Sequence, residues 1–255
     1  MIVRVHLTPG EIGDAAFRGK AVVVIDVLRA NTSIAYARAN GAEKLIPTAS
    51  IEAATRLATS LDRATTLLCG EREGRPISGF DLGNSPLEFT NETVAGKTLI
   101  MTTTNGTETI ARLDGAREIV VCSLVNVSAV ARYLREESEL SIACSGKLGA
   151  FSLEDAVCAG SLIVRLRDLG VGPVAGNDAA VAAGLARSAG LITSAAAIMV
   201  CLFASFGLTE LTATREFGLG LAVAVALDAS IIRLVVIPAL MRLLGEANWW
   251  FPRLP

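Results

Sequence analysis

Short runs of β-branched and other apolar residues recur along the first two thirds of the chain, and each ends in a small polar cluster. The clearest run, residues 21–25, is followed by Asp26, Arg29, Thr32 and Ser33. Similar runs are residues 66–69, 98–102 and 140–144. In α/β sheets, ligands bind beyond the carboxyl ends of the strands. The pattern therefore predicts where a site lies before it indicates what the site does.

The spacing of apolar residues predicts an α/β fold with a mostly parallel sheet and flanking helices. Strands are expected near residues 2–6, 21–26, 44–48, 66–70, 98–103, 118–123 and 140–145. Helices are expected near residues 33–40, 51–61, 106–113, 126–136 and 152–169. Residues 70–90 have no clear period but contain Phe80 and Phe89, so we interpret them as an ordered active-site loop.

Composition narrows the function classes. The net charge is -2 and the pI is about 5.6, so no global basic field would recruit nucleic acid. His6 is the single histidine, which nearly excludes a histidine metal cage or a Ser-His triad. The five cysteines form no CxxC pair, and their hydrophobic neighbours suggest reduced, largely buried thiols, which favours a cytoplasmic catalytic domain.

The last third of the chain differs in composition. Residues 191–208 carry no charge and are long enough to span a bilayer, and a second apolar stretch covers residues 217–244. Trp249 and Trp250 follow where an interfacial belt would lie. We interpret residues 190–245 as an all-α transmembrane hairpin in the cytoplasmic membrane, with both ends facing the cytoplasm. A buried helix pair in a soluble protein is the alternative.

Asp26 is the first candidate for chemistry. It follows four β-branched residues, where an unpaired carboxylate would be costly, so it is either a magnesium ligand, a catalytic carboxylate or the partner of Arg29. The planar guanidinium of Arg29 suits a phosphate or a sulfonate. Thr32 and Ser33 add hydrogen-bond donors in the same turn.

A second polar cluster, Thr103, Thr104, Asn105 and Gly106, lies between a predicted strand and a predicted helix. Its hydroxyls, its backbone N–H groups and the helix dipole could together bind an anion. An ordinary capped turn is the equal alternative. The cluster is not a P-loop, because the Gly-Lys-Thr of that motif is absent.

Further carboxylates and one thiol complete the candidates. Asp26, Glu71 and Asp155 are the predicted Mg²⁺ ligands, since Mg²⁺ prefers hard oxygen donors and needs only one or two carboxylates. Any one of them could instead be a surface charge. Cys144 ends a predicted strand and is either a nucleophile or a buried structural thiol.

Residues 1–178 resemble the 2-phosphosulfolactate phosphatase (ComB) family. The matching segments are residues 23–33, 70–72, 79–86, 102–107, 151–155, 158–160 and 176–179. The resemblance implies an α/β phosphatase that uses Mg²⁺ to hydrolyse 2-phospho-3-sulfolactate to 3-sulfolactate, on the route to coenzyme M. With the clusters above, it selects Asp26, Arg29, Cys144 and Asp155 as catalytic residues. It also selects as substrate-binding residues Thr32, Ser33, Asn84, Ser85, Thr103, Thr104, Asn105 and Gly106.

Residues 180–255 instead resemble the carboxyl end of MMPL-type membrane transporters of the RND superfamily. The matching segments are residues 184–187, 192–196, 215–220, 227–229, 236–240 and 248–250. The two families do not normally share a chain, so we predict a chimera of a truncated phosphatase domain, residues 1–178, and a transporter fragment, residues 179–255. An inactive fusion carrying that fragment is the alternative function. The expected partners are a small phosphorylated sulfonate and the membrane, and a homodimer is compatible with the sequence.

Overall fold

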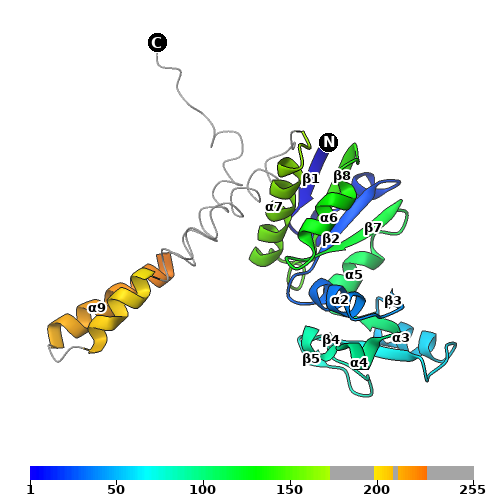
Figure 1. Cartoon of the computed structure of the whole chain (residues 1–255), viewed down its shortest axis with the longest axis horizontal. Coiled ribbons are helices and arrows are strands. Elements are labelled where there is room, and N and C mark those ends of the chain that lie inside the picture. Colours follow the sequence, from blue (N-terminus) through cyan, green and yellow to red (C-terminus); the bar gives the residue numbers. More distant parts are fainter. Residues whose placement is uncertain (173–197, 209–211, 229–255) are drawn as a thin grey trace, which may run out of the picture.

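Two four-stranded sheets form the body of the protein in a computed structural model, which describes residues 1–172, 198–208 and 212–228 (Figure 1). The first sheet has the order β1 (Ile2–His6), β8 (Glu139–Cys144), β2 (Ala21–Ile25) and β7 (Glu118–Cys122), all parallel. The second has the order β3 (Lys44–Pro47), β6 (Thr98–Thr102), β4 (Thr66–Arg72) and β5 (Arg75–Pro76). Only β5 is antiparallel to its neighbour.

Helices connect and cover these strands. They are α1 (Asp14–Phe17), α2 (Ala30–Ala39), α3 (Ile51–Ala58), α4 (Asn91–Val94), α5 (Gly106–Ala111), α6 (Val127–Leu134) and α7 (Leu153–Asp168), with 3₁₀ turns η1 (Pro9–Glu11) and η2 (Pro86–Glu88). The α/β class and each expected strand and long helix of residues 1–169 are confirmed. The division into two sheets was not predicted, because apolar runs reveal strands but not which strands pair.

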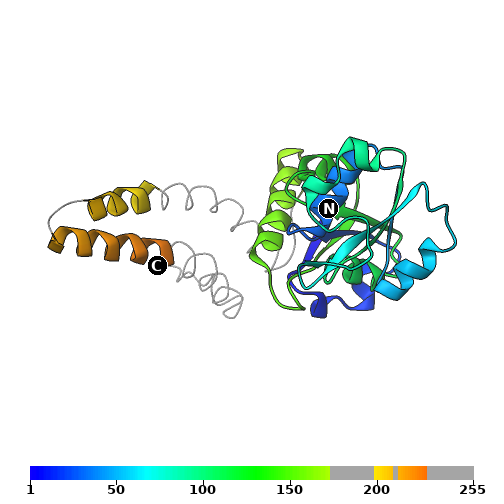
Figure 2. The same ribbon diagram turned by 90° about the horizontal axis from the view of Figure 1, so that it is seen from below.

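The alternation of side chains along β2 shows how the first sheet is buried on both faces. Val23 and Ile25 join the core beneath α6 and α7, whereas Val22 and Val24 pack on the other face with Phe17 and Leu113. Such double burial is why β2 is apolar at every position. Figure 2 shows strands lying between helical layers.

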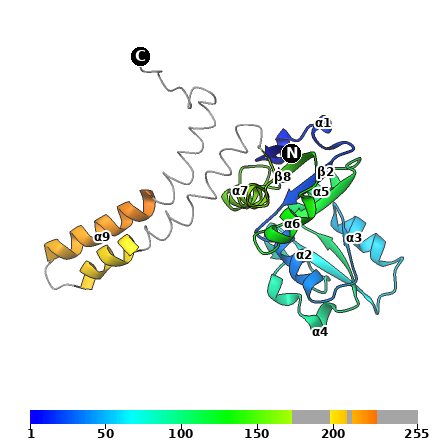
Figure 3. The ribbon, with the colours of Figure 1, turned by 45° about the horizontal axis from the view of Figure 1, so that its top comes forward.

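The second sheet has a similar arrangement. Ala54 and Ala58 of α3 pack on Leu68 and Ile100, where their small side chains allow a close approach of helix and sheet. The opposite face forms a separate core that includes Ile34 of α2, Leu99, Met101 and Phe89. In Figure 3, α2 and α3 accordingly lie on opposite sides of these strands.

Two connections join the sheets and place the site. Helix α2 carries the chain from β2 to the second sheet, and α5 returns it from β6 to β7. Asn31 of α2 is fully buried, and its Nδ2 donates to the carbonyl oxygens of Val24 at 2.7 Å and Cys122 at 3.2 Å. This amide fixes the start of α2 against the ends of β2 and β7.

The predicted membrane hairpin falls only partly within the described residues. Residues 198–208 end in η3 (Phe206–Leu208), and α9 (Thr212–Leu227) follows. In the described part of the chain, no helix combines the length and the apolar character that crossing a membrane requires. Residues 191–197, 229–244 and the tryptophan pair lie outside the described residues, as does the expected domain boundary at 178. The structure therefore gives the hairpin no support.

The Asn31 amide provides a test of this junction. We expect Asn31→Ala to lower the free energy of unfolding by about 1–3 kcal/mol, because two buried carbonyl groups lose their donor. Urea unfolding of the purified protein measures the change. Asn91→Ala is the matched control, since the Asn91 amide also donates to a carbonyl but is exposed. Equal effects of the two substitutions would contradict the assignment.

Candidate active site

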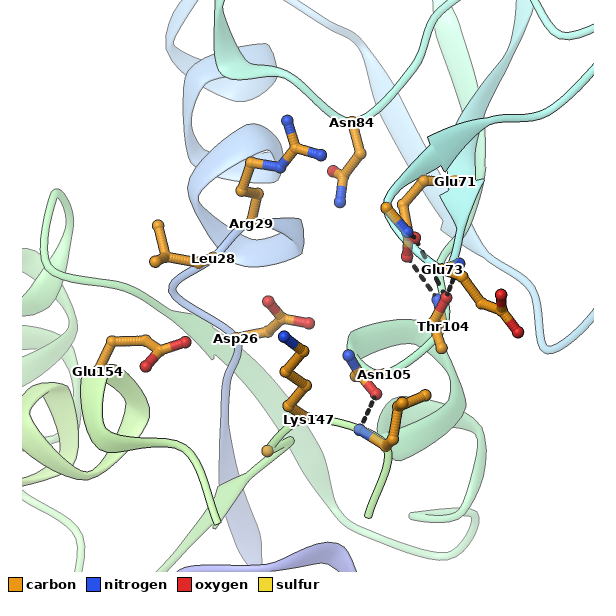
Figure 4. A pocket seen from close by; sticks show the side chains of 13 residues that line it. Asp26, Leu28, Arg29, Glu71, Glu73, Asn84, Thr104, Asn105, Lys147 and Glu154 are labelled. Atoms are coloured by element: carbon orange, nitrogen blue, oxygen red, sulfur yellow. Dashed lines mark hydrogen bonds between the residues drawn. The ribbon is translucent and has the colours of Figure 1, made fainter. Parts of the chain in front are cut away.

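A cavity of about 430 Å³ opens where the carboxyl ends of strands from both sheets meet (Figure 4). It is lined by the end of β2, the β4–β5 turn, the loop before η2, the β6–α5 turn, the turn after β8 and the first turn of α7. The lining residues are Asp26, Leu28, Arg29, Glu71, Glu73, Gly74, Asn84, Thr104, Asn105, Gly146, Lys147, Leu148 and Glu154. The polar clusters that end the apolar runs thus converge as the sequence pattern predicted.

Asp26 lies at the base of this cavity, directly after β2, and is 6% exposed. Its Oδ1 accepts the N–H of Ala30 at 3.1 Å. Burial raises the pKa of Asp26 to about 6, and the charges of Glu71 and Glu154 raise it further, while N–H groups of Ala30 and Gly106 lower it. The ionised form is therefore destabilised and would be favoured by a cation in the cavity.

Gly106 allows the close approach of α5 to Asp26. A Cβ atom at this position would lie 2.7 Å from Oδ2 of Asp26 and 2.8 Å from the Cβ of Ala30. Gly106 does not line the cavity, so its role is to leave room for the carboxylate.

Glu71 ties two of the lining turns together. Its Oε1 accepts the N–H of Thr104 at 2.7 Å, and its Oε2 accepts the N–H of Gly74 at 2.6 Å and the Thr104 hydroxyl at 3.1 Å. Glu71 is 7% exposed, and these donors compensate its buried charge. It is both a wall of the cavity and the link between β4 and the β6–α5 turn.

The predicted anion-binding turn, residues 103–106, directs two of its backbone N–H groups to other parts of the protein. The N–H of Thr104 binds Glu71, and the N–H of Thr103 donates to the hydroxyl of Thr107 at 2.8 Å. Thr103 is 2% exposed and does not line the cavity. Thr104 and Asn105 do line it. This turn therefore offers side chains, rather than those two amides, to a ligand.

Of the other predicted substrate-binding residues, only Asn84 lines the cavity. Asn84 is 5% exposed, and its Oδ1 has no hydrogen-bond partner among the described residues. Ser33 donates its hydroxyl to the Asn84 carbonyl at 3.0 Å, Thr32 donates to the Val27 carbonyl at 2.7 Å, and Ser85 caps η2. These three hydroxyl residues hold the backbone around the site instead of entering it.

Two cations enter the cavity, Arg29 at the start of α2 and Lys147 after β8. Neither side chain forms an ion pair or a hydrogen bond with another described residue, so the Asp26–Arg29 ion pair considered from the sequence is not formed. Figure 4 shows Arg29 and Lys147 on either side of Asp26. Both cations are available to an anionic ligand.

Asp155 and Cys144, two predicted catalytic residues, lie behind the cavity wall. Asp155 is 2% exposed, and its two oxygens accept the N–H groups of Val27 at 2.9 Å and Gly146 at 3.0 Å. Burial, and then the charge of Asp26, raise the pKa of Asp155 to about 7. Cys144 is fully buried in the core beneath β8 and does not line the cavity. Glu154, the residue before Asp155, lines the cavity in its place.

The sequence analysis assigned no role to the lining residues Glu73 and Lys147, and it selected Asp155 rather than the adjacent Glu154 as a metal ligand. Lys147 follows directly on the polar cluster 144–146, so the strand-end pattern contained the signal. Glu73 belongs to the β4–β5 turn and has a left-handed φ of 52°.

The donor set bears on the expected metal. Across the described residues, no three Asp, Glu, His or Cys side chains form a cluster that could hold a metal ion. Mg²⁺ needs only one or two carboxylates because it keeps several waters. Of the three predicted ligands, Asp26 and Glu71 line the cavity, whereas Asp155 does not line it and binds backbone N–H groups with both oxygens.

An α/β fold with carboxylates and unpartnered cations in one cavity defines the class of protein. It is a protein with an enzyme-like site for a small, multiply charged anion. A family model described as 2-phosphosulpholactate phosphatase matches residues 6–237, and the chain belongs to this family. The match extends past residue 178 into the segment that resembles MMPL-type transporters. That second resemblance, and the chimera inferred from it, has no support in the comparisons.

Similar proteins are each named "Probable 2-phosphosulfolactate phosphatase". The protein of Caldanaerobacter subterraneus subsp. tengcongensis is 44% identical over 170 residues, which are 66% of this chain and 70% of that protein. Those of Thermotoga maritima and Gloeobacter violaceus are 44% and 47% identical over 155 and 163 residues, 60% and 63% of this chain. The aligned part is 66% of the length of each of these two.

The raised pKa values predict how stability depends on pH. Asp26 and Asp155 bind protons more tightly in the folded protein than at their ordinary pKa of 3.8. Stability should therefore fall as the pH rises from about 4 to about 7. Between about pH 5.5 and about pH 7.5, the wild type should lose unfolding free energy as Asp26 ionises. The Asp26→Asn variant should lose about 1 kcal/mol less over the same range.

Urea unfolding in the presence of a chelator measures this difference. Asp114→Asn, an exposed carboxylate away from the cavity, is the control and should keep the wild-type slope. Identical slopes for wild type and Asp26→Asn would mean that the Asp26 carboxyl titrates normally.

Proposed function

We propose that the chain hydrolyses the phosphate ester of 2-phospho-3-sulfolactate to 3-sulfolactate and inorganic phosphate, with Mg²⁺ as cofactor. Membership of the family and the names of the relatives support the substrate. The observation that carries the proposal is one cavity in which Asp26 lies between Arg29 and Lys147, two cations without protein partners. A substrate with phosphate, sulfonate and carboxylate groups matches this charge pattern.

The roles of the residues follow from their positions. Arg29 would bind phosphate oxygens through its planar fork and offset charge as the ester bond breaks. Asp26 has a pKa of about 6 in the metal-free cavity and a lower one once a cation binds, so its carboxylate is ionised and can act as a base at neutral pH. It would take a proton from the attacking water as the water oxygen bonds to phosphorus. The bond from phosphorus to the ester oxygen breaks, and that oxygen leaves with the sulfolactate and takes a proton from solvent.

An aspartyl phosphate on Asp26 is the competing route, with the Asp26 oxygen attacking phosphorus and water then releasing phosphate. A thiol intermediate on Cys144 is disfavoured, since that sulfur is buried in the core. For Mg²⁺, the supporting observation is the destabilised charge of Asp26 beside Glu71 and Glu154. Asp26 and Glu71 or Glu154 would hold the ion, which would supply positive charge at the phosphate.

Asp26 provides the direct test. Asp26→Asn should reduce Mg²⁺-dependent phosphate release from 2-phospho-3-sulfolactate by at least about 100-fold, because both ion binding and proton transfer need the carboxylate. The assay follows inorganic phosphate with Mg²⁺ and with a chelator, and circular dichroism checks the fold. Asp114→Asn should keep full turnover. Wild-type activity in Asp26→Asn would remove Asp26 from the site.

A substitution at Gly106 tests whether catalysis needs the space that this residue leaves beside Asp26. Gly106→Ala should lower turnover by at least about tenfold, because the new methyl group must displace Asp26 or the start of α2. Gly13→Ala is the matched control, since a Cβ there meets no atom within 4 Å. Equal turnover of the two variants would show that the approach of α5 to Asp26 does not matter for catalysis.

The membrane hairpin of residues 190–245 and the cytoplasmic placement of the catalytic domain stay predictions. Apolar composition supports the first and cysteine usage the second. Carbonate washing of cell membranes separates the outcomes: a chain that stays in the pellet supports a hairpin, and a chain that is released contradicts it.

A further inference from the structure

We propose that Lys147 is a substrate-binding residue, carried on a rigid turn that Asp155 and Asn105 hold in place at the cavity. The inference rests on the proposed function of the same cavity and deepens it. It gives a second anionic group of the substrate a cation of its own, opposite Arg29.

The turn after β8 is closed by its own backbone. The N–H of Lys147 donates to the Ala150 carbonyl at 3.0 Å, and the N–H of Ala150 returns to the Lys147 carbonyl at 3.0 Å. Leu148 and Gly149 between them have φ values of 52° and 78°, as in a two-residue turn of type I′. A leucine in the left-handed region is strained, and such strain persists only where the surroundings fix the backbone.

Two neighbouring elements supply that fixation. Oδ2 of Asp155, from α7, accepts the N–H of Gly146 at 3.0 Å, and Oδ1 of Asn105 accepts the N–H of Leu148 at 2.9 Å. Gly146 has no room for a side chain, since a Cβ there would lie 2.1 Å from the Ala150 carbonyl oxygen. The residues on both sides of Lys147 are therefore anchored.

The Lys147 side chain takes no part in this anchoring. It is exposed, it lines the cavity, and within the described residues its ammonium group has neither an ion-pair nor a hydrogen-bond partner. Figure 4 shows it extending toward Asp26 from the side opposite Arg29. The turn keeps its shape without any contact from the Lys147 side chain, and it directs that side chain into the cavity. We expect this arrangement where a lysine binds a ligand.

Charge balance explains why such a lysine is needed. Four carboxylates line the cavity, namely those of Asp26, Glu71, Glu73 and Glu154. They would repel a substrate with three acidic groups, and Arg29 can contact only one or two of these groups. The flexible, point-like ammonium group of lysine suits a sulfonate or carboxylate whose position is less constrained than that of the reacting phosphate.

Steady-state kinetics on 2-phospho-3-sulfolactate with Mg²⁺ test the assignment. Lys147→Met, which keeps the length of the side chain but not its charge, should raise KM by about tenfold or more while kcat changes by less than about threefold. Lys147→Arg should restore KM to within about threefold of wild type. Lys44→Met, an exposed lysine on β3, is the control and should keep the wild-type KM.

A binding measurement without turnover separates this inference from the proposed function. Calorimetry with 3-sulfolactate should show the same loss of affinity in Lys147→Met and the same recovery in Lys147→Arg. An inactive wild type whose sulfolactate binding still depends on Lys147 would refute the phosphatase activity but retain the binding role. An active wild type with unchanged KM and affinity in Lys147→Met would overturn the role of Lys147.

Discussion

The burial of the Asp26 carboxylate is the constraint on which the rest of the site depends. Its surroundings favour the protonated form, since burial and the nearby charges of Glu71 and Glu154 outweigh two backbone N–H groups. The fold accommodates this cost through β2, which is buried at every position and ends directly before Asp26, and through Gly106, which leaves space for Oδ2. A carboxylate held in this way is destabilised when the cavity is empty and favoured when cations and a polyanionic ligand enter together.

The two sheets cooperate to build this environment. The first sheet supplies Asp26, and the second supplies Glu71, whose oxygens link the β4–β5 turn to Thr104. Asp155 performs the matching task on the first sheet by joining the end of β2 to the turn after β8. Two buried carboxylates thus position backbone, while Arg29 and Lys147 keep their charges for a ligand. Asp155 contacts only backbone, whereas Glu71 both links two turns and lines the cavity.

The sequence was sufficient to predict the strands and long helices of residues 1–169 and the sheet edge at which the cavity lies. Strongly apolar runs such as residues 21–25 predict strands well, and the polar residues after them fall at the cavity because parallel strands end at the same edge. Which residue of each polar cluster faces the cavity depends on tertiary geometry. Glu154 and Asp155 are adjacent at the start of one helix, and only packing shows that the first faces the cavity and the second the backbone. Likewise, the amides of Thr103 and Thr104 are consumed by Thr107 and Glu71, partners that no local pattern reveals.

The central claim is that Asp26 holds a destabilised charge that Mg²⁺ and the ligand relieve. Carbon-13 NMR titration of the Asp26 carboxyl group, assigned by comparison with Asp26→Asn, measures this directly. The account predicts a pKa of about 6 in the metal-free protein and a clear decrease when Mg²⁺ and 3-sulfolactate are both present. An ordinary pKa near 3.8 that does not respond to either addition would contradict it.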